Sequence, residues 1–142
     1  MPRRGPLAVP AGYSGTPLVR KLGIRPGDRL AVLDAPEGYW KLLEGLPPVE
    51  RLTARARSLD LVHLFVERAS TLRTRLPKLL AAIARDGAIW VSWPKKSSGV
   101  ATDVTEDVVR REALPLGLVD VKVCAVDEIW SGLKLVIRKE LR

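Results

Sequence analysis

LDLVHLFVERASTLRTRLPKLLAAIARDGAIWVSWPKKSSGVATDVTE, residues 59–106, is the stretch of the sequence that decides the fold. Its apolar runs at 59–66 and 88–93 predict two buried strands, and the apolar spacing between them predicts a helix over 70–84. Two strands joined by one helix form a parallel pair with a right-handed crossover. Ligands of open α/β sheets bind at the carboxyl ends of such strands. The stretch therefore predicts the fold class and the edge of the sheet that carries the site.

Three residues mark the predicted helix and its connection. Ser70 is the expected N-cap, and Gly87 ends the connection to the next strand. Pro77 disturbs the helical pattern, because an interior proline removes one backbone hydrogen bond.

The rest of the chain supplies the other elements of an α/β sheet. Residues 1–12 are expected to form an extended arm, and residues 13–142 a single Rossmann-like domain. The expected elements are helices over 17–22, 39–43 and 104–114, and strands over 29–34, 51–54, 118–126 and 133–138. Only six residues join the last two strands, so these must be antiparallel. We therefore predict a three-layer fold with a mostly parallel sheet of about six strands, in the order 2-1-3-4-6-5, and a C-terminal antiparallel hairpin.

The composition is that of one ordinary globular domain, with 142 residues, 46% of them hydrophobic and 28% charged. No apolar run is long enough to span a membrane. No apolar segment follows the basic start at 1–6, so we do not expect a secretory signal. The single cysteine, Cys124, excludes an internal disulfide. We expect a cytoplasmic protein without a membrane partner, and its oligomeric state is not determined by the sequence.

The net charge of +8 raises nucleic acid as a partner. The basic residues are scattered and interleaved with acids, which favours an ordinary solvated surface. A nucleic-acid-binding module would instead gather five basic residues on one face: Arg3, Arg4, Arg20, Lys21 and Arg25.

The loop that follows the predicted strand 88–93 carries two ammonium groups and two hydroxyl groups, on Lys95, Lys96, Ser97 and Ser98. Because a helix is predicted to follow, the loop could bind an anion. Asp103 and Glu106 have the spacing of a capping box, so these carboxylates could instead satisfy the helix and pair with the lysines. Both interpretations stay open, and the internal ion network is slightly favoured.

The turn after the first strand does not resemble a cofactor loop. Asp34, Glu37 and Gly38 belong to a turn that has one glycine and a rigid proline, and no acid follows the second strand. We therefore expect no adenosyl cofactor, and no cofactor of another kind is predicted. No His-x-x-His or Cys-x-x-Cys pattern accompanies the acids at the strand ends, so no metal site is predicted either.

The other side chains that could take part in catalysis are expected to have packing roles. His63 lies in the middle of a strand and Cys124 lies between apolar residues, so both are expected in the core. No catalytic residue is predicted. Trp93 and Trp130 lie at loop boundaries, where they could wall a pocket or stack on a base, although packing under loops is favoured.

Two resemblances add to this interpretation. The segment 79–87 leading into Ala88-Ile89-Trp90-Val91 resembles the helix-to-strand junction of methyltransferase-type Rossmann folds. Six motifs (YSGTPL, APEG, WPKK, GVATD, VKVCAVD and WSGL) are similar to those of a bacterial domain-of-unknown-function family of small proteins. This second resemblance implies a cytosolic bacterial protein and assigns no reaction.

Together these observations favour a binding domain over an enzyme. It would recognise a small anionic ligand or a protein partner at the carboxyl edge of the sheet. The alternatives are a transferase that acts on a nucleotide-like substrate and has a degenerate cofactor site, and a nucleic-acid-binding module. The candidate ligand-binding residues are Tyr13, Ser14, Thr16, Asp34, Glu37, Gly38, Glu67, Lys95, Lys96, Ser97, Ser98 and Asp103.

Overall fold

The computed structural model describes residues 15–142. The predicted arm over 1–12 and the candidate residues Tyr13 and Ser14 lie outside this range. The helices are α1 (Leu18–Leu22), α2 (Tyr39–Leu42), α3 (Ala69–Ala82) and α4 (Glu106–Ala113), with 3₁₀ turns at Lys96–Ser98, Leu114–Leu116 and Lys139–Leu141. The strands are β1 (Arg29–Leu33), β2 (Glu50–Leu52), β3 (Leu59–Phe65), β4 (Ile83–Pro94), β5 (Leu118–Ala125) and β6 (Trp130–Ile137). None of the helices in this range is long and apolar enough to cross a lipid bilayer.

The six strands form one mixed sheet in the order β2-β1-β3-β4-β6-β5, which confirms the predicted order. β2, β1, β3 and β4 are parallel, and β6 runs antiparallel to both β4 and β5. The fold is therefore a Rossmann-like α/β fold, and the C-terminal antiparallel hairpin is also as predicted.

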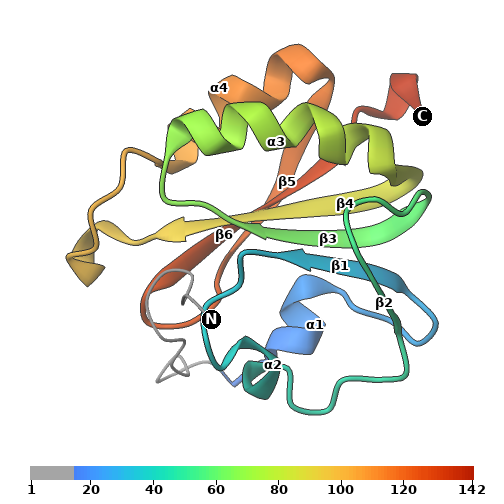
Figure 1. Ribbon diagram of the computed structural model, residues 1–142, viewed down its shortest axis with the longest axis horizontal. Coiled ribbons are helices and arrows are strands. Elements are labelled where there is room, and N and C mark those ends of the chain that lie inside the picture. Colours follow the sequence, from blue (N-terminus) through green and yellow to red (C-terminus); the bar gives the residue numbers. More distant parts are fainter. Residues whose placement is uncertain (1–14) are drawn as a thin grey trace.

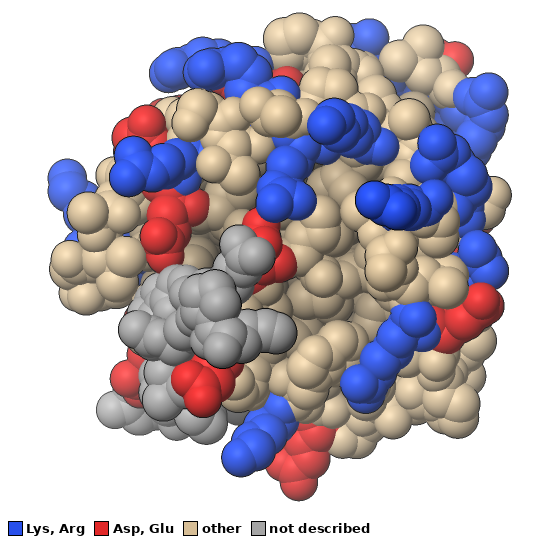
Figure 2. Space-filling view, in the orientation of Figure 1, with Lys and Arg blue, Asp and Glu red and all other residues tan. Residues whose placement is uncertain are grey.

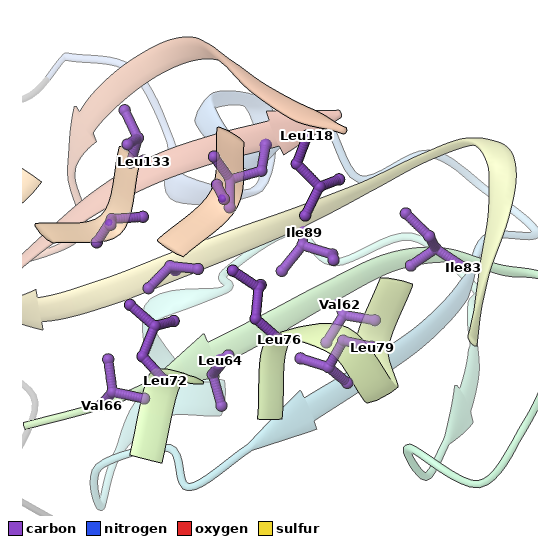
Figure 3. Packing of buried hydrophobic residues seen from close by; sticks show 14 of the residues in the cluster. Val62, Leu64, Val66, Leu72, Leu76, Leu79, Ile83, Ile89, Leu118 and Leu133 are labelled. Atoms are coloured by element: carbon purple, nitrogen blue, oxygen red, sulfur yellow. The ribbon is translucent and has the colours of Figure 1, made fainter. Parts of the chain in front are cut away.

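Helices cover both faces of the sheet (Figure 1). α3 and α4 lie on one face and α1 and α2 on the other. Successive residues of β3 serve the two faces in turn: Val62 and Leu64 pack under α3, whereas Leu61 and Phe65 pack towards α1 and α2. Figure 3 shows the first of these two cores, in which Leu72, Leu76 and Leu79 of α3 meet β3 and β4. Burial on both faces explains why β3 and β4 read as continuous apolar runs.

The junction between α3 and β4 differs from the prediction. α3 ends at Ala82 and β4 begins at Ile83, five residues before the expected start of the strand. Ile83 pairs with Leu59, and the register then shifts, so the polar residues after Ile83 belong to an irregular start of the strand. A Cβ atom on Gly87 would lie 2.6 Å from the carbonyl oxygen of Leu59. Gly87 therefore permits a close approach of two strands and does not end a loop.

Candidate functional site

A cavity of about 300 Å³ lies at the carboxyl edge of the sheet. It is lined by Asp34, Phe65, Val66, Glu67, Arg68, Thr71, Arg75 and Trp130. Asp34 directly follows β1, Glu67 and Arg68 connect β3 to α3, and Trp130 begins β6. The parallel strands end here together, so residues far apart in the sequence share one hollow. The cavity is at the lower end of the size range of small-molecule sites.

One side of the cavity is held by an ion pair. The carboxylate of Asp34 lies 3.0 Å from the guanidinium of Arg75, which projects from the second turn of α3. Asp34 has a φ of +59°, an uncommon conformation for a residue other than glycine. The strained turn directs the chain out of β1, and the ion pair connects this turn to α3.

The turn between β3 and α3 is held by the loop that precedes α4. The hydroxyl of Thr102 donates to the carbonyl oxygen of Glu67 at 2.7 Å, and Asp103 Oδ1 accepts from the backbone N–H of Ala69 at 2.7 Å. Asp103 thus caps the start of α3, so the predicted N-cap Ser70 is wrong. Asp103 therefore serves a helix that begins 34 residues earlier in the chain.

α4 has a different cap from the predicted capping box. Thr105 is its N-cap, and the Thr105 hydroxyl accepts from the backbone N–H of Val108. Glu106 is the first residue of the helix, and its carboxylate pairs with Arg110 one turn later. The predicted pairing of Asp103 with Glu106 is therefore wrong.

The lysine loop lies beyond the lining of the cavity. The ammonium of Lys95 donates to the carbonyl oxygen of Asp127 at 2.7 Å, and the backbone N–H of Lys95 donates to Ile129. Asp127 is buried, and its carboxylate accepts from the backbone N–H groups of Ile129 and Trp130 in the same turn. Lys95 therefore holds the turn between β5 and β6, and the expectation that it shares a hollow with Asp34 and Glu67 is wrong.

The other candidate residues of this loop also lie outside the cavity lining. Lys96 and Ser97 are exposed, and the Ser98 hydroxyl donates to the carbonyl oxygen of Lys95 within the 3₁₀ turn. Thr16, Glu37 and Gly38 do not line the cavity either. Of the candidate residues that the structure describes, Asp34 and Glu67 are the two that it places on the cavity wall.

Three polar residues of the wall were not predicted from the sequence. Arg68 directly follows Glu67, so the argument that selected Glu67 would have selected Arg68 as well. Thr71 and Arg75 are four residues apart in α3 and therefore lie on one side of the helix. Their spacing was visible, but the sequence did not show that this side faces the end of β1.

Trp130, one of the lining residues, carries a buried donor without an acceptor in the described part of the chain. Its ring is 1% exposed and packs edge-on against Phe65 at 5.1 Å. The indole N–H is buried and donates to no acceptor within the described residues. A buried donor without an acceptor is uncommon in proteins and costs free energy unless water or a ligand satisfies it.

Three buried polar side chains form a hydrogen-bonded series that links α2, β3 and β4: Tyr39, His63 and Ser92. Nδ1 of His63 lies 2.7 Å from the hydroxyl of Tyr39, and Nε2 lies 2.7 Å from the hydroxyl of Ser92. Burial lowers the pKa of His63 to about 3 and raises that of Tyr39. His63 is fully buried, as predicted, and it does not line the cavity. It is therefore a structural residue.

Cys124 is half-buried, and burial raises the pKa of its thiol, although three nearby lysines act in the opposite direction. A protonated thiol is a poor nucleophile. Within residues 15–142 the structure holds no group of three His, Cys, Asp or Glu side chains arranged to bind a metal ion.

The space-filling view bears on the nucleic-acid alternative. Figure 2 shows Lys and Arg spread over this face with Asp and Glu between them. Several of the arginines that contribute to the charge are paired with acids, as Arg73 is with Glu112 and Arg29 with Glu50. Arg3 and Arg4 lie outside the described residues, so the predicted five-residue cluster is not tested.

Comparison with solved structures shows the same fold in methyltransferases. A SAM-dependent methyltransferase from Aquifex aeolicus gives a TM-score of 0.59 at 9% identity, covering 84% of this chain and 88% of the other. Magnesium protoporphyrin IX methyltransferase from Synechocystis, with SAM bound, gives 0.56 at 13% identity, covering 84% and 74%. A ribosomal-protein methylase from Lactobacillus delbrueckii gives the same score, identity and coverage.

No protein-family model and no curated protein sequence matches the chain. The resemblance to a bacterial family of unknown function therefore stays a prediction. At these identities the structural matches show the fold. They also contradict the expectation of a non-enzymatic domain, because the structures that share this fold are named as methyltransferases.

The residues of this chain do not fit the SAM that one of these neighbours holds. A glycine-rich turn lets the backbone approach such a cofactor, and an acid after the second strand holds its ribose. Here the turn contains the buried Pro36, and Asp34 is already paired with Arg75. After β2 the chain continues with Thr53, Ala54 and Arg55, none of which is an acid. The fold is thus of the methyltransferase type, whereas the position that would hold the cofactor lacks these recognition groups.

Proposed function

We propose that the protein is a transferase that acts on a nucleotide-like substrate, which binds in the cavity at the carboxyl edge of the sheet. The observation that carries the proposal is the position of this cavity, between the ends of β1 and β3 and the start of α3, in a sheet with methyltransferase topology. The cofactor site is degenerate, so the cavity is the part of the site that still offers groups for recognition.

The wall suits a polar small molecule. It presents carboxylates, guanidinium groups and a hydroxyl beside the aromatic ring of Trp130. Nucleotide-like molecules combine hydroxyl groups, an aromatic base and frequently a charged group, so they can use every kind of group on this wall. A nucleotide-like molecule can carry negative charge, so the proposal keeps the small anionic ligand expected from the sequence. It places this ligand beside the turn between β3 and α3 and not at the lysine loop.

The first test is a native mass spectrum of the freshly purified full chain, which reports a retained ligand and the subunit count together. The second is a thermal-shift panel of nucleosides, nucleotides and S-adenosylmethionine. We expect a nucleoside or nucleotide to raise the melting temperature and S-adenosylmethionine to leave it unchanged. Compounds that bind are then incubated with candidate acceptors, and mass spectrometry detects the transferred group.

A matched pair of variants locates the binding. Thr71→Gln adds two heavy atoms at the cavity wall, whereas Thr74→Gln makes the same change on the exposed side of α3. We expect Thr71→Gln to remove the ligand-induced shift and Thr74→Gln to retain it. Equal shifts in both variants would show that the ligand binds elsewhere and would contradict the proposal.

A further inference from the structure

Three lysine side chains from separate parts of the chain lie beside the end of β5. The ammonium of Lys21, in α1, donates to the carbonyl oxygen of Ala125 at 3.2 Å. The ammonium of Lys95 donates to the carbonyl oxygen of Asp127, whose α-carbon is at most about 7 Å from that of Ala125. Lys122, in β5, donates to the carbonyl oxygen of Lys21 at 3.2 Å. The three ammonium groups therefore follow one another along β5, which is an edge strand of the sheet.

The positive charge of these lysines is not neutralised by acids. Within the described residues none of the three forms an ion pair, because each hydrogen bond goes to a neutral carbonyl group. The carboxylate of Asp127 is buried and accepts from backbone N–H groups of its own turn. Burial raises the pKa of the Cys124 thiol, and the charges that lower it are those of Lys21, Lys122 and Lys95. The charged groups that act on Cys124 are thus cations.

Lys134, in β6, extends the row, because it is the cross-strand partner of Lys122. Like charges directly opposite each other destabilise an antiparallel pair of strands. Burial, together with the charges of Lys122 and Arg25, lowers the pKa of Lys134, which has no ion pair within residues 15–142. Beyond Lys134 the row ends at a hollow whose lining also includes three acids: Asp28, Asp60 and Asp86.

A row of ammonium groups suits an anion that repeats along a polymer. Each ammonium has three N–H donors, and Lys21, Lys95 and Lys122 each use one on a carbonyl group, so further donors remain. These hydrogen bonds also hold the ammonium groups in place, which lowers the entropy lost when a ligand binds. An anion beside Lys122 and Lys134 would remove their mutual repulsion. Phosphate groups repeat along a nucleic-acid strand, and lysine side chains contact them without reading the sequence.

We propose that the lysine row, formed by Lys21, Lys95, Lys122 and Lys134, binds the phosphate backbone of a single-stranded nucleic acid and does not read its bases. The row contains no aromatic side chain on which a base could stack. The net charge of +8 adds attraction at longer range. Of the five-residue basic cluster considered from the sequence, the row contains Lys21 alone. None of the four lysines lines the cavity at the carboxyl edge of the sheet, so the row is a separate site.

The test is fluorescence anisotropy of a labelled oligouridylate, titrated with the full chain at several salt concentrations. Each phosphate contact on a single strand contributes about −0.7 to the slope of log K against log salt concentration. Four contacts therefore predict that the affinity falls about 50-fold or more between about 50 and 200 mM salt. A fall of less than about 3-fold, which is the effect of one contact, or no binding at the lower salt concentration would overturn the inference.

Paired variants separate the lysine row from the overall charge. Lys21→Gln combined with Lys122→Gln removes two ammonium groups of the row, whereas Lys78→Gln combined with Arg111→Gln removes two charges from exposed positions of α3 and α4. We expect the first pair to reduce the salt-dependent fall in affinity from about 50-fold to about 7-fold, and the second pair to retain the wild-type value. Equal changes in the two pairs would show that only the net charge matters and would contradict the inference.

Lys134→Gln tests the row without removing a hydrogen bond, since Lys134 donates to no acceptor within the described residues. It should reduce the salt-dependent fall about 2- to 3-fold, and an unchanged slope would contradict the place of Lys134 in the row. Thermal unfolding of each variant separates a loss of binding from a loss of the fold.

Two further probes test the chemistry of the partner. Oligoadenylate should bind as tightly as oligouridylate, because the row contacts the backbone, and polyglutamate should bind more weakly than either. Tighter binding of polyglutamate would identify an acidic polypeptide as the partner and would overturn the inference. These results leave the proposed transferase untouched, because its ligand is tested at the cavity by the thermal-shift panel.

Discussion

Lowering the pH should destabilise this protein through its single histidine. His63 is fully buried, and its two ring nitrogens face the hydroxyls of Tyr39 and Ser92. Neither hydroxyl carries a charge that could offset an imidazolium, so burial holds the pKa of His63 at about 3, below its ordinary value of 6.5. The folded protein therefore keeps His63 neutral at a pH where the unfolded chain already binds a proton.

The sign and size of the effect follow from this difference. Between pH about 6.5 and about 3 the unfolded state binds one more proton than the folded state, so stability falls as the pH falls through this window. Each pH unit well inside the window costs about 1.4 kcal/mol. From pH about 7.5 to about 5.0 the loss is therefore about 2 kcal/mol. This value depends little on the folded-state pKa, provided that the pKa lies below about 4.

The assay is urea denaturation of the full chain at several pH values between about 7.5 and 5.0, a range above the ordinary titration of carboxylates. Because the chain has one histidine, His63→Gln removes this titration completely. We expect the variant to be less stable at neutral pH and to lose about 2 kcal/mol less than the wild type on acidification. Parallel pH profiles would refute the reasoning. An NMR titration gives a second measurement on the wild type, in which the imidazole signals should not shift over this range.

Two further predictions concern hydrogen bonds between distant parts of the chain. Lys95→Met should lower the free energy of unfolding by about 1 kcal/mol, because the Lys95 ammonium donates to the Asp127 carbonyl in the β5–β6 turn. Lys96→Met should leave the free energy of unfolding unchanged in the same urea titration, since Lys96 is exposed. A larger effect at Lys96 than at Lys95 would contradict this assignment. Asp103→Ala should cost about 1 kcal/mol through the lost cap on Ala69, and Asp103→Asn less, since the amide oxygen can still accept. Hydrogen exchange should show the loss at the start of α3, and a loss confined to α4 would support the capping box instead.

The sequence predicted the framework of this protein well because the signals for it are local. A continuous apolar run identifies a strand buried on both faces, as in β3, and a helical repeat of leucines identifies α3. The short connection before β6 required an antiparallel pair. The same reasoning placed Asp34 and Glu67 at the ends of neighbouring strands, and the structure puts both on the cavity wall.

The failures concern side chains whose partners lie far along the chain. The lysine loop has the composition of an anion site, but the acceptor of Lys95 is a carbonyl 32 residues later. Asp103 has the spacing to cap the following helix, yet it caps a helix 34 residues earlier. In each case a local pattern allowed two partners, and the sequence contained no information on which of them would be nearby.

The sequence by itself thus determined the order of the strands, the layers and the edge of the sheet where the cavity lies, because apolar periodicity and connection length act over a few residues. Only the tertiary structure decided which polar groups face the cavity. Arg68, Arg75 and Trp130 come from a turn, a helix and a hairpin, and they line one wall because the packed sheet brings these elements together. Hydrogen bonds and ion pairs form between groups that packing places within about 3 Å of each other, so the site is a property of the folded arrangement and not of any one segment.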